Sequence, residues 1–154
     1  MNLKLARDET GAPEIFRSIQ GEGRNAGRIR TFVRFAGCNL HCVWCDTAYT
    51  WNWLGTDFPH ERDRPDAPYK FNIDEEIATL SVEEVCAVVR DLPAEGVVIT
   101  GGEPLMQRRG LEALAQALKA DDPARLIEIE TNGSIAPSEA LAAQVDLFMV
   151  SPKL

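Results

Sequence analysis

The residues that first suggest chemistry are three cysteines, Cys38, Cys42 and Cys45, which lie within eight residues of one another. Their C-x3-C-x2-C spacing puts three thiolates on one tight loop, and three thiolates can bind three irons of a cubane 4Fe-4S cluster. The fourth iron of such a cluster has no protein ligand and is open to another molecule. The spacing therefore predicts an iron–sulfur centre that binds a further ligand.

A structural zinc site is the alternative for these cysteines, and such a site needs four closed protein ligands. His41 lies inside the cysteine loop, His60 is remote from it, and Cys86 falls on the apolar face of an expected helix. We expect Cys86 to be a small core residue. From the cysteines alone, a non-catalytic zinc or iron–sulfur module that binds a partner stays open.

The elements that must position the cysteine loop are indicated by the hydrophobic pattern. Residues 30–35 favour a strand that leads directly into the loop. A helix is expected to begin at Ser81, with a capping box to Glu84, and to end before Pro93. Further strands are expected at 96–100, 126–130 and 147–150, with helices from 105 or 109 to 120 and at 137–143. This βαβαβ order predicts an α/β fold whose active site lies at the carboxyl ends of parallel strands.

The composition excludes several classes of protein. Sixteen basic and 24 acidic residues give a net charge of −8, which would repel a phosphate backbone, so we expect no direct nucleic-acid binding. The longest uncharged stretch, 35–45, is far shorter than the roughly 20 apolar residues of a membrane helix. Residues 1–7 have no apolar run typical of a secretory signal. We therefore expect a cytoplasmic protein with no membrane association.

One domain is expected across residues 1–154, because this length supports a single hydrophobic core. Residues 48–79 contain three prolines and mixed charges and are expected to form an insertion or lid. The sequence stops directly after the expected strand at 147–150, with no helix to cover it. We therefore expect the C-terminal part of the sheet to be missing.

A Gly101-Gly102-Glu103-Pro104 turn follows the strand at 96–100, and its glycines would let the backbone approach a ligand closely. Combined with the cysteine motif, this turn resembles the radical S-adenosylmethionine (SAM) superfamily, in which the open iron binds the amino and carboxylate groups of SAM. Further segments resemble the 7-carboxy-7-deazaguanine synthase family over essentially the whole chain: 14–23 (EIFRSIQGEG), 45–47 (CDT), 97–104 (VVITGGEP), 127–133 (IEIETNG) and 150–154 (VSPKL).

The resemblance implies an α/β fold of a particular kind, a partial (β/α)6-type radical SAM barrel that is open on one side. It also implies a ring contraction of 6-carboxy-5,6,7,8-tetrahydropterin to 7-carboxy-7-deazaguanine with release of ammonia, a step of queuosine and 7-deazapurine biosynthesis. In this family, a radical made from SAM removes hydrogen from C6 of the pterin, and SAM is regenerated. The implied cofactors are the 4Fe-4S cluster, SAM and Mg2+.

The resemblance also implies roles for individual residues. Cys38, Cys42 and Cys45 would bind the cluster and Thr47 the magnesium. The expected substrate-binding residues are Ile19, Gln20, Gly21, Glu22, Arg34 and Thr100. Glu22 and Arg34 are the expected catalytic residues, since the guanidinium fork of Arg34 matches a carboxylate bidentately. The residues expected beside SAM are Trp44, Cys45, Asp46, Gly102, Glu103, Ser151, Pro152 and Lys153.

Some of these assignments have alternatives. Glu103 is expected to orient the glycine turn, with contact to the SAM amine as the other interpretation, and Lys153 could equally be a solvated terminal charge. Glu130, Thr131 and Asn132 are second-tier candidates for the same pocket wall. A rival within the superfamily is a glycyl-radical activase, which uses the same cysteine spacing on a protein substrate. The segment 20–23 (QGEG) and the position of Arg34 argue against it.

Two kinds of partner are implied beside the pterin. An electron donor such as flavodoxin or ferredoxin would reduce the cluster. The family is usually homodimeric, and a second subunit could cover the sheet edge left bare after Val150.

Overall fold

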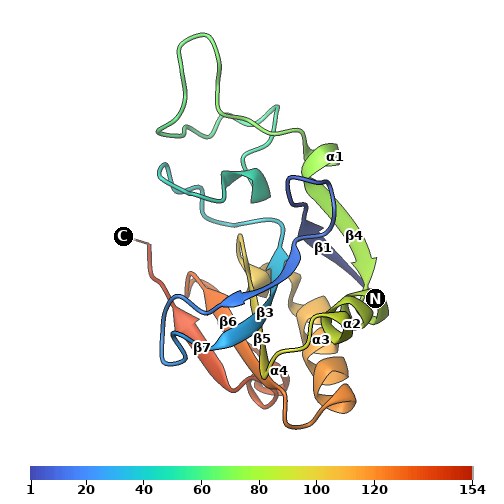
Figure 1. Cartoon of the computed structure of the whole chain (residues 1–154). Coiled ribbons are helices and arrows are strands. Elements are labelled where there is room, and N and C mark those ends of the chain that lie inside the picture. The colour runs from blue at the N-terminus through green and yellow to red at the C-terminus, as the bar shows by residue number, and fades with distance from the viewer. Residues whose placement is uncertain (154) are drawn as a thin grey trace.

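A mixed β-sheet organises the computed structural model, which describes residues 1–153 (Figure 1). The described residues form seven strands: β1 Asn2–Ala6, β2 Ile15–Ile19, β3 Ile29–Phe35, β4 Ile77–Ser81, β5 Gly96–Gly101, β6 Leu126–Thr131 and β7 Leu147–Val150. The strand order is β4-β1-β3-β5-β6-β7, and β2 pairs with β3. The helices are α1 Ile73–Glu76, α2 Val82–Asp91, α3 Arg108–Asp121 and α4 Glu139–Ala142, with the 3-10 turns η1 Ala48–Thr50 and η2 Pro104–Gln107.

The parallel half of the sheet is close to the sequence prediction. Strands β3, β5, β6 and β7 pair in parallel, and the register places Arg34 beside Thr100 and Glu130 beside Met149. The strands at 96–100, 126–130 and 147–150 are confirmed to within a residue. The four carboxyl ends therefore meet at one edge of the sheet, where the cysteine loop also begins.

The other half of the sheet is antiparallel and was not predicted. Strand β1 pairs antiparallel with both β3 and β4, and β2 forms an antiparallel hairpin with β3. The residues described form a mixed, unclosed sheet, so the expectation of a run of βα units is corrected for this half. The physical reason is that β2 is mostly exposed beyond its first residue, which weakens any hydrophobic signal.

The hydrophobic core lies on one face of the sheet, under α2 and α3 (Figure 1). Val33, Ile99 and Ile129 point into it from neighbouring strands. Because side chains alternate along a strand, the intervening residues of β3, β5 and β6 face the opposite side. Ser81 caps α2 with the expected capping box to Glu84, and Cys86 is buried in the core as expected.

Residues 48–79 are only partly the insertion that the sequence suggested. Residues 77–79 belong to β4, which pairs with β1, so these three residues are part of the sheet. The rest contains η1 and α1 and projects beyond the end of the sheet that carries the cysteine loop (Figure 1). The interpretation as an insertion or lid stays a prediction for residues 48–76. In residues 1–153, no helix is both long and apolar enough to cross a membrane.

Candidate active site

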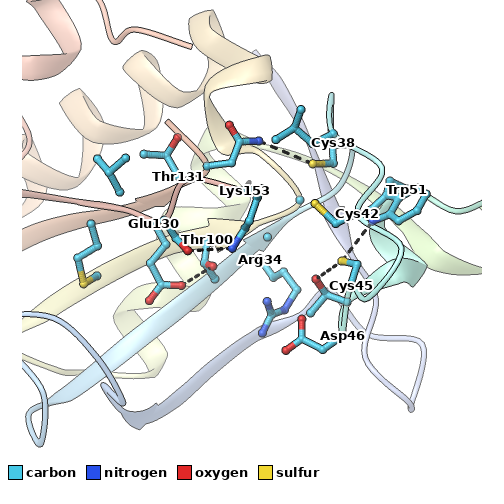
Figure 2. Close-up of a pocket in the computed structure, with 18 of the residues that line it drawn as sticks. Arg34, Cys38, Cys42, Cys45, Asp46, Trp51, Thr100, Glu130, Thr131 and Lys153 are labelled. Carbon is cyan, nitrogen blue, oxygen red and sulfur yellow. Dashed lines mark hydrogen bonds between the residues drawn. The ribbon is translucent and has the colours of Figure 1, made fainter. Parts of the chain in front are cut away.

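A cavity of about 600 Å³ lies at the carboxyl ends of the parallel strands (Figure 2). The cysteine loop forms one side of it, and the ends of β5, β6 and β7 form the other. Its walls include Glu22, Gly23, Arg34, Cys38, Leu40, Cys42, Trp44, Cys45, Asp46, Thr47, Trp51, Thr100, Gly101, Gly102, Glu130, Thr131, Asn132, Met149, Val150, Ser151 and Lys153. The structure therefore brings most of the predicted site residues to one place.

The three predicted cluster cysteines all line this cavity and carry free thiols. Burial raises the pKa of the Cys38 thiol above its ordinary value. The indole N–H of Trp51 donates to Cys45 Sγ at 3.3 Å, and Asn132 Nδ2 lies 4.0 Å from Cys38 Sγ. These N–H groups can stabilise negative charge on two of the sulfurs, which suits thiolate ligands.

The candidates for a fourth zinc ligand are occupied elsewhere. The ring of His41 stacks on Phe58 with 3.5 Å between centroids, and His60 Nε2 hydrogen bonds to the Cys45 carbonyl at 2.9 Å. Among residues 1–153, no three His, Cys, Asp or Glu side chains are gathered closely enough to bind a single metal ion. The histidines hold the cysteine loop in place rather than facing the cavity with the thiols.

Residues 48–76 pack against the cysteine loop. Gly37 donates its backbone N–H to the Thr50 carbonyl at 2.8 Å, and Glu61 donates to the Val43 carbonyl at 2.8 Å. The His41 ring also meets Trp51 edge to face. This segment therefore buttresses the loop, a role that the sequence did not reveal.

The glycine turn after β5, Gly101-Gly102, approaches another part of the backbone closely, where the sequence suggested that it would approach a ligand. A Cβ at Gly102 would lie 2.1 Å from the Gly37 carbonyl oxygen, and one at Gly101, where φ is +131°, would lie 2.0 Å from the Phe35 carbonyl oxygen. The backbone N–H groups of Gly102 and Glu103 donate to these same two residues. The glycines thus permit close approach to the start of the cysteine loop, and these two N–H groups are not free to bind a ligand.

Glu103 lies behind the cavity wall and is fully buried. Its carboxylate accepts hydrogen bonds from Thr131 Oγ1, from the backbone N–H of Asn132 at 2.8 Å and from the backbone N–H of Leu105 at 3.0 Å. The side chain therefore orients the turn and the end of β6. This geometry matches the first of the two interpretations of Glu103.

A polar group of side chains forms the sheet side of the cavity. Thr100 Oγ1 donates to Glu130 Oε2 at 2.6 Å, and Gln20 Nε2 donates to Glu130 Oε1 at 3.2 Å. Figure 2 shows Arg34, Thr100 and Glu130 on neighbouring strands beside the cysteine loop, to its left in this view. Together, a carboxylate, a hydroxyl and a guanidinium in this part of the cavity can form hydrogen bonds with the donors and acceptors of a polar ring and with an anionic substituent on it.

Arg34 takes part in a second network that the sequence did not predict. Its Nε donates to Glu14 Oε1 at 2.7 Å, and Tyr49 Oη donates to Glu14 Oε2 at 2.8 Å. Burial works to lower the pKa of Arg34, but the hydrogen bond and the charge of Glu14 outweigh burial, so the pKa is raised. Arg34 therefore lines the cavity as a fixed cation.

Several expected site residues do not line the cavity as the structure describes it. Ile19 lies on the exposed surface of the β2–β3 hairpin opposite Ile29, Gly21 has no side chain to offer, and Gln20 acts through Glu130. Pro152 and Glu103 are likewise absent from the described walls. Sequence reasoning gave no role to Glu14, Tyr49 or Trp51. Glu14 lies opposite Arg34 through the register of the β2–β3 hairpin, which the sequence pattern does not record.

The residues of the cavity fit an iron–sulfur cluster. Three thiols face one space, two of them with N–H donors nearby, and the space is large enough for a further molecule beside them. Cys38, Cys42 and Cys45 would be the ligands, which leaves one iron without a protein ligand.

Comparison with known families defines the class. Residues 32–151 match the Radical SAM superfamily, and the chain belongs to this superfamily. Membership implies a 4Fe-4S cluster and SAM as cofactors.

The more specific resemblance to 7-carboxy-7-deazaguanine synthases is confirmed. Proteins of that name from Pyrobaculum aerophilum, Hyperthermus butylicus and Haemophilus influenzae are 45%, 39% and 35% identical to this chain. The matches cover 92%, 91% and 91% of this chain and 54%, 50% and 51% of the relatives, so the chain spans about half their length. The crystal structure of QueE from Escherichia coli matches with a TM-score of 0.69 at 28% identity, over 100% of this chain and 61% of that one.

Proposed function

We propose that the protein acts as a 7-carboxy-7-deazaguanine synthase, which contracts the ring of 6-carboxy-5,6,7,8-tetrahydropterin and releases ammonia in queuosine and 7-deazapurine biosynthesis. The observation that carries this proposal is one cavity whose walls combine three thiols with Arg34, Thr100 and Glu130. The thiols suit the cluster of the superfamily, and the polar group suits a carboxylated pterin. The names of the relatives support the same product, 7-carboxy-7-deazaguanine.

The cysteine side of the cavity would hold the cofactors. When bound, the cluster would supply the electron for reductive cleavage of SAM, the radical chemistry typical of this superfamily. Trp51 and Asn132 would stabilise the sulfur charge through their N–H groups. SAM would contact Trp44, Asp46, Gly102, Ser151 and Lys153, which line the cavity, with Pro152 next to them in the chain.

The sheet side would bind the pterin. Arg34 would bind its carboxylate through a charge-assisted hydrogen-bonded pair. Glu22, which lines the cavity from the β2–β3 loop, would accept hydrogen bonds from the amino edge of the ring, as would Glu130. Thr47, two residues after Cys45, offers a hydroxyl oxygen that suits Mg2+ beside the substrate carboxylate.

Two partners complete the proposal. A small electron-transfer protein such as flavodoxin or ferredoxin would reduce the cluster. A homodimer would place a second copy against part of the open sheet, in keeping with the unpaired outer edges of β4 and β7, the first and last strands of the order described.

The test is anaerobic reconstitution with iron and sulfide, followed by dithionite, SAM, Mg2+ and 6-carboxy-5,6,7,8-tetrahydropterin. We expect the mass of 7-carboxy-7-deazaguanine to appear. Cleavage of SAM to 5′-deoxyadenosine with the pterin unchanged would contradict the proposed substrate and favour the glycyl-radical activase.

A matched pair of cysteine variants tests the cluster itself. Cys42→Ala should abolish the bound iron and its visible absorption, because two thiolates cannot replace three. Cys86→Ala should bind iron like the unchanged protein, because Cys86 lies in the core under the sheet. Equal iron contents in the two variants would overturn the assignment of the three cysteines.

A further inference from the structure

Glu14 and Arg34 face each other across the β2–β3 hairpin. Ile15 pairs with Val33, so residue 14 follows opposite residue 34, and the backbone N–H of Arg34 donates to the Glu14 carbonyl at 3.1 Å. The Glu14 backbone N–H is bound in turn to the Ala6 carbonyl at 2.8 Å. The carboxylate of Glu14 is therefore carried by a backbone that is held on both sides.

Both oxygens of the Glu14 carboxylate have a donor. Oε1 accepts from Arg34 Nε at 2.7 Å and Oε2 accepts from Tyr49 Oη at 2.8 Å. The side chains of Arg34 and Glu14 are only 18% and 14% exposed. Burial raises the pKa of the Tyr49 phenol, which keeps it a neutral donor at physiological pH. The carboxylate is thus fixed in position, and a fixed acceptor fixes the guanidinium.

The network forms a partition between two hollows. Arg34 lines the active-site cavity, whereas Glu14 and Tyr49 line a second cavity of about 590 Å³, and Asp46 lines both. Glu14 therefore engages the guanidinium from the side away from the active site, through Nε. The two terminal nitrogens of Arg34 have no bond to Glu14 in the structure and remain for a ligand. Such a pair of nitrogens can bind both oxygens of one carboxylate.

We propose that Glu14, held by Tyr49, is a positioning residue that presents the two terminal nitrogens of Arg34 to the carboxylate of the substrate. This inference rests on the proposed function, since the carboxylated pterin is the ligand whose anionic group Arg34 meets. Tyr49 follows the cysteine loop in the chain, so the same contact couples the substrate-binding arginine to the loop that would hold the cluster.

Glu14 should affect the binding of a substrate carboxylate in two opposing ways. Its negative charge opposes the attraction of a substrate carboxylate to Arg34, so removing the charge alone would tighten binding. Its hydrogen bond holds the guanidinium in place before the substrate binds. Without this contact, the guanidinium would have to become ordered when the substrate binds, and that entropy cost would weaken binding. The proposal is that orientation outweighs charge at this partly buried position.

The test compares binding of two pterins to the protein under anaerobic conditions, by calorimetry. One is 6-carboxy-5,6,7,8-tetrahydropterin and the other is the same ring without the carboxylate. We expect Glu14→Ala to weaken binding of the carboxylated pterin by about 10- to 100-fold, the scale of a hydrogen bond to a charged group. Binding of the ring without the carboxylate should stay within about twofold of the unchanged protein, because no ligand group then meets Arg34.

Smaller changes separate positioning from a general structural role. Tyr49→Phe removes one hydroxyl and should weaken binding of the carboxylated pterin by about 2- to 10-fold. Glu14→Gln keeps an acceptor for Arg34 and should recover part of the loss in Glu14→Ala. In an Arg34→Ala background, Glu14→Ala should cause no further loss. Glu9→Gln, an exposed carboxylate beside the second cavity, is the matched control and should bind both pterins normally.

The outcomes separate the inference from the proposed function. If the unchanged protein binds both pterins equally, Arg34 does not bind a carboxylate, and the proposed substrate contact and the inference both fail. If it discriminates between them and Glu14→Ala discriminates equally well, positioning by Glu14 is overturned while the proposed function stands. Equal weakening of both pterins by Glu14→Ala would also overturn the inference, because it would indicate only local unfolding.

Discussion

Two ion pairs on strand β3 have nearly the same length and very different surroundings. Arg30 Nε lies 2.6 Å from Glu128 Oε1, and Arg34 Nε lies 2.7 Å from Glu14 Oε1. The two arginines are four residues apart on one face of the sheet. The side chains of the first pair are 1% and 0% exposed, whereas the second pair borders the active-site cavity.

The difference lies in what each pair leaves available. In the Arg30–Glu128 pair, the lower pair, Glu128 Oε1 also accepts a hydrogen bond from Asn25 Nδ2 at 2.9 Å, and Arg30 Nη1 donates to the Ile29 carbonyl at 3.0 Å. Within residues 1–153, Glu128 Oε2 has no hydrogen-bond partner. In the Arg34–Glu14 pair, the upper pair, both carboxylate oxygens of Glu14 accept a hydrogen bond, and the two terminal nitrogens of Arg34 are not bonded to Glu14. The lower pair therefore joins parts of the fold, and the upper pair has the geometry that the proposed contact with a substrate carboxylate needs.

The largest effect should come from breaking the lower pair. Glu128→Ala leaves the Arg30 guanidinium buried without its principal counter-ion, and we expect a loss of about 3–5 kcal/mol in the free energy of unfolding. Urea denaturation followed by circular dichroism measures this change.

Replacing both members of the lower pair is the control. The double variant Arg30→Met with Glu128→Leu buries no unpaired charge and should lose much less stability than Glu128→Ala alone. A loss below about 1 kcal/mol in Glu128→Ala would contradict the picture of a tightly buried pair and would place it with exposed ion pairs.

Breaking the upper pair should affect binding more than folding. Arg34→Ala leaves the mostly buried Glu14 carboxylate with its bond to Tyr49, so the unfolding free energy should fall by about 1–3 kcal/mol, less than in Glu128→Ala. The affinity for 6-carboxy-5,6,7,8-tetrahydropterin should fall by about 10- to 100-fold. Iron content and SAM cleavage should stay largely intact.

An exposed arginine on the same hairpin is the control for Arg34. Arg17→Ala lies on β2 away from the cavity and should change neither stability nor binding appreciably. If Arg34→Ala lost iron, SAM cleavage and pterin binding together, its assigned contact with the substrate would be wrong.

The two ion pairs also show which features of the molecule could be predicted from the sequence. The cysteine loop and the parallel strands were predictable because buried β-branched runs such as 96–100 leave a strong local signal. Arg34 was predictable because it lies four residues before Cys38 on the strand that leads into the loop. In residues 126–130 the alternation of isoleucine and glutamate even indicates that one face of β6 carries two carboxylates.

The partners of these charges were not predictable. Glu14 meets Arg34 through an antiparallel hairpin whose outer strand is mostly exposed, and Glu128 meets Arg30 across two strand pairings. Such contacts depend on register and on loops that fold over the sheet, which local patterns do not record. The same limit explains why the strand at residues 77–81 was not expected, since β4 pairs with a strand some 70 residues earlier in the chain.

The smallest predicted effect comes from the residue that links the two regions. Asn25 lies in the loop that carries Gln20 and Glu22, and its amide ties this loop to Glu128 below the cavity. Asn25→Ala should cost about 1 kcal/mol of stability, the usual net value of one hydrogen bond, and should weaken pterin binding a few-fold while SAM binding stays unchanged. Denaturation and calorimetry measure the two effects, with exposed Arg24→Ala in the same loop as control. A loss of stability with no change in pterin affinity would mean that the contact between Asn25 and the lower pair stabilises only the fold. The loop would then be held at the cavity by other contacts.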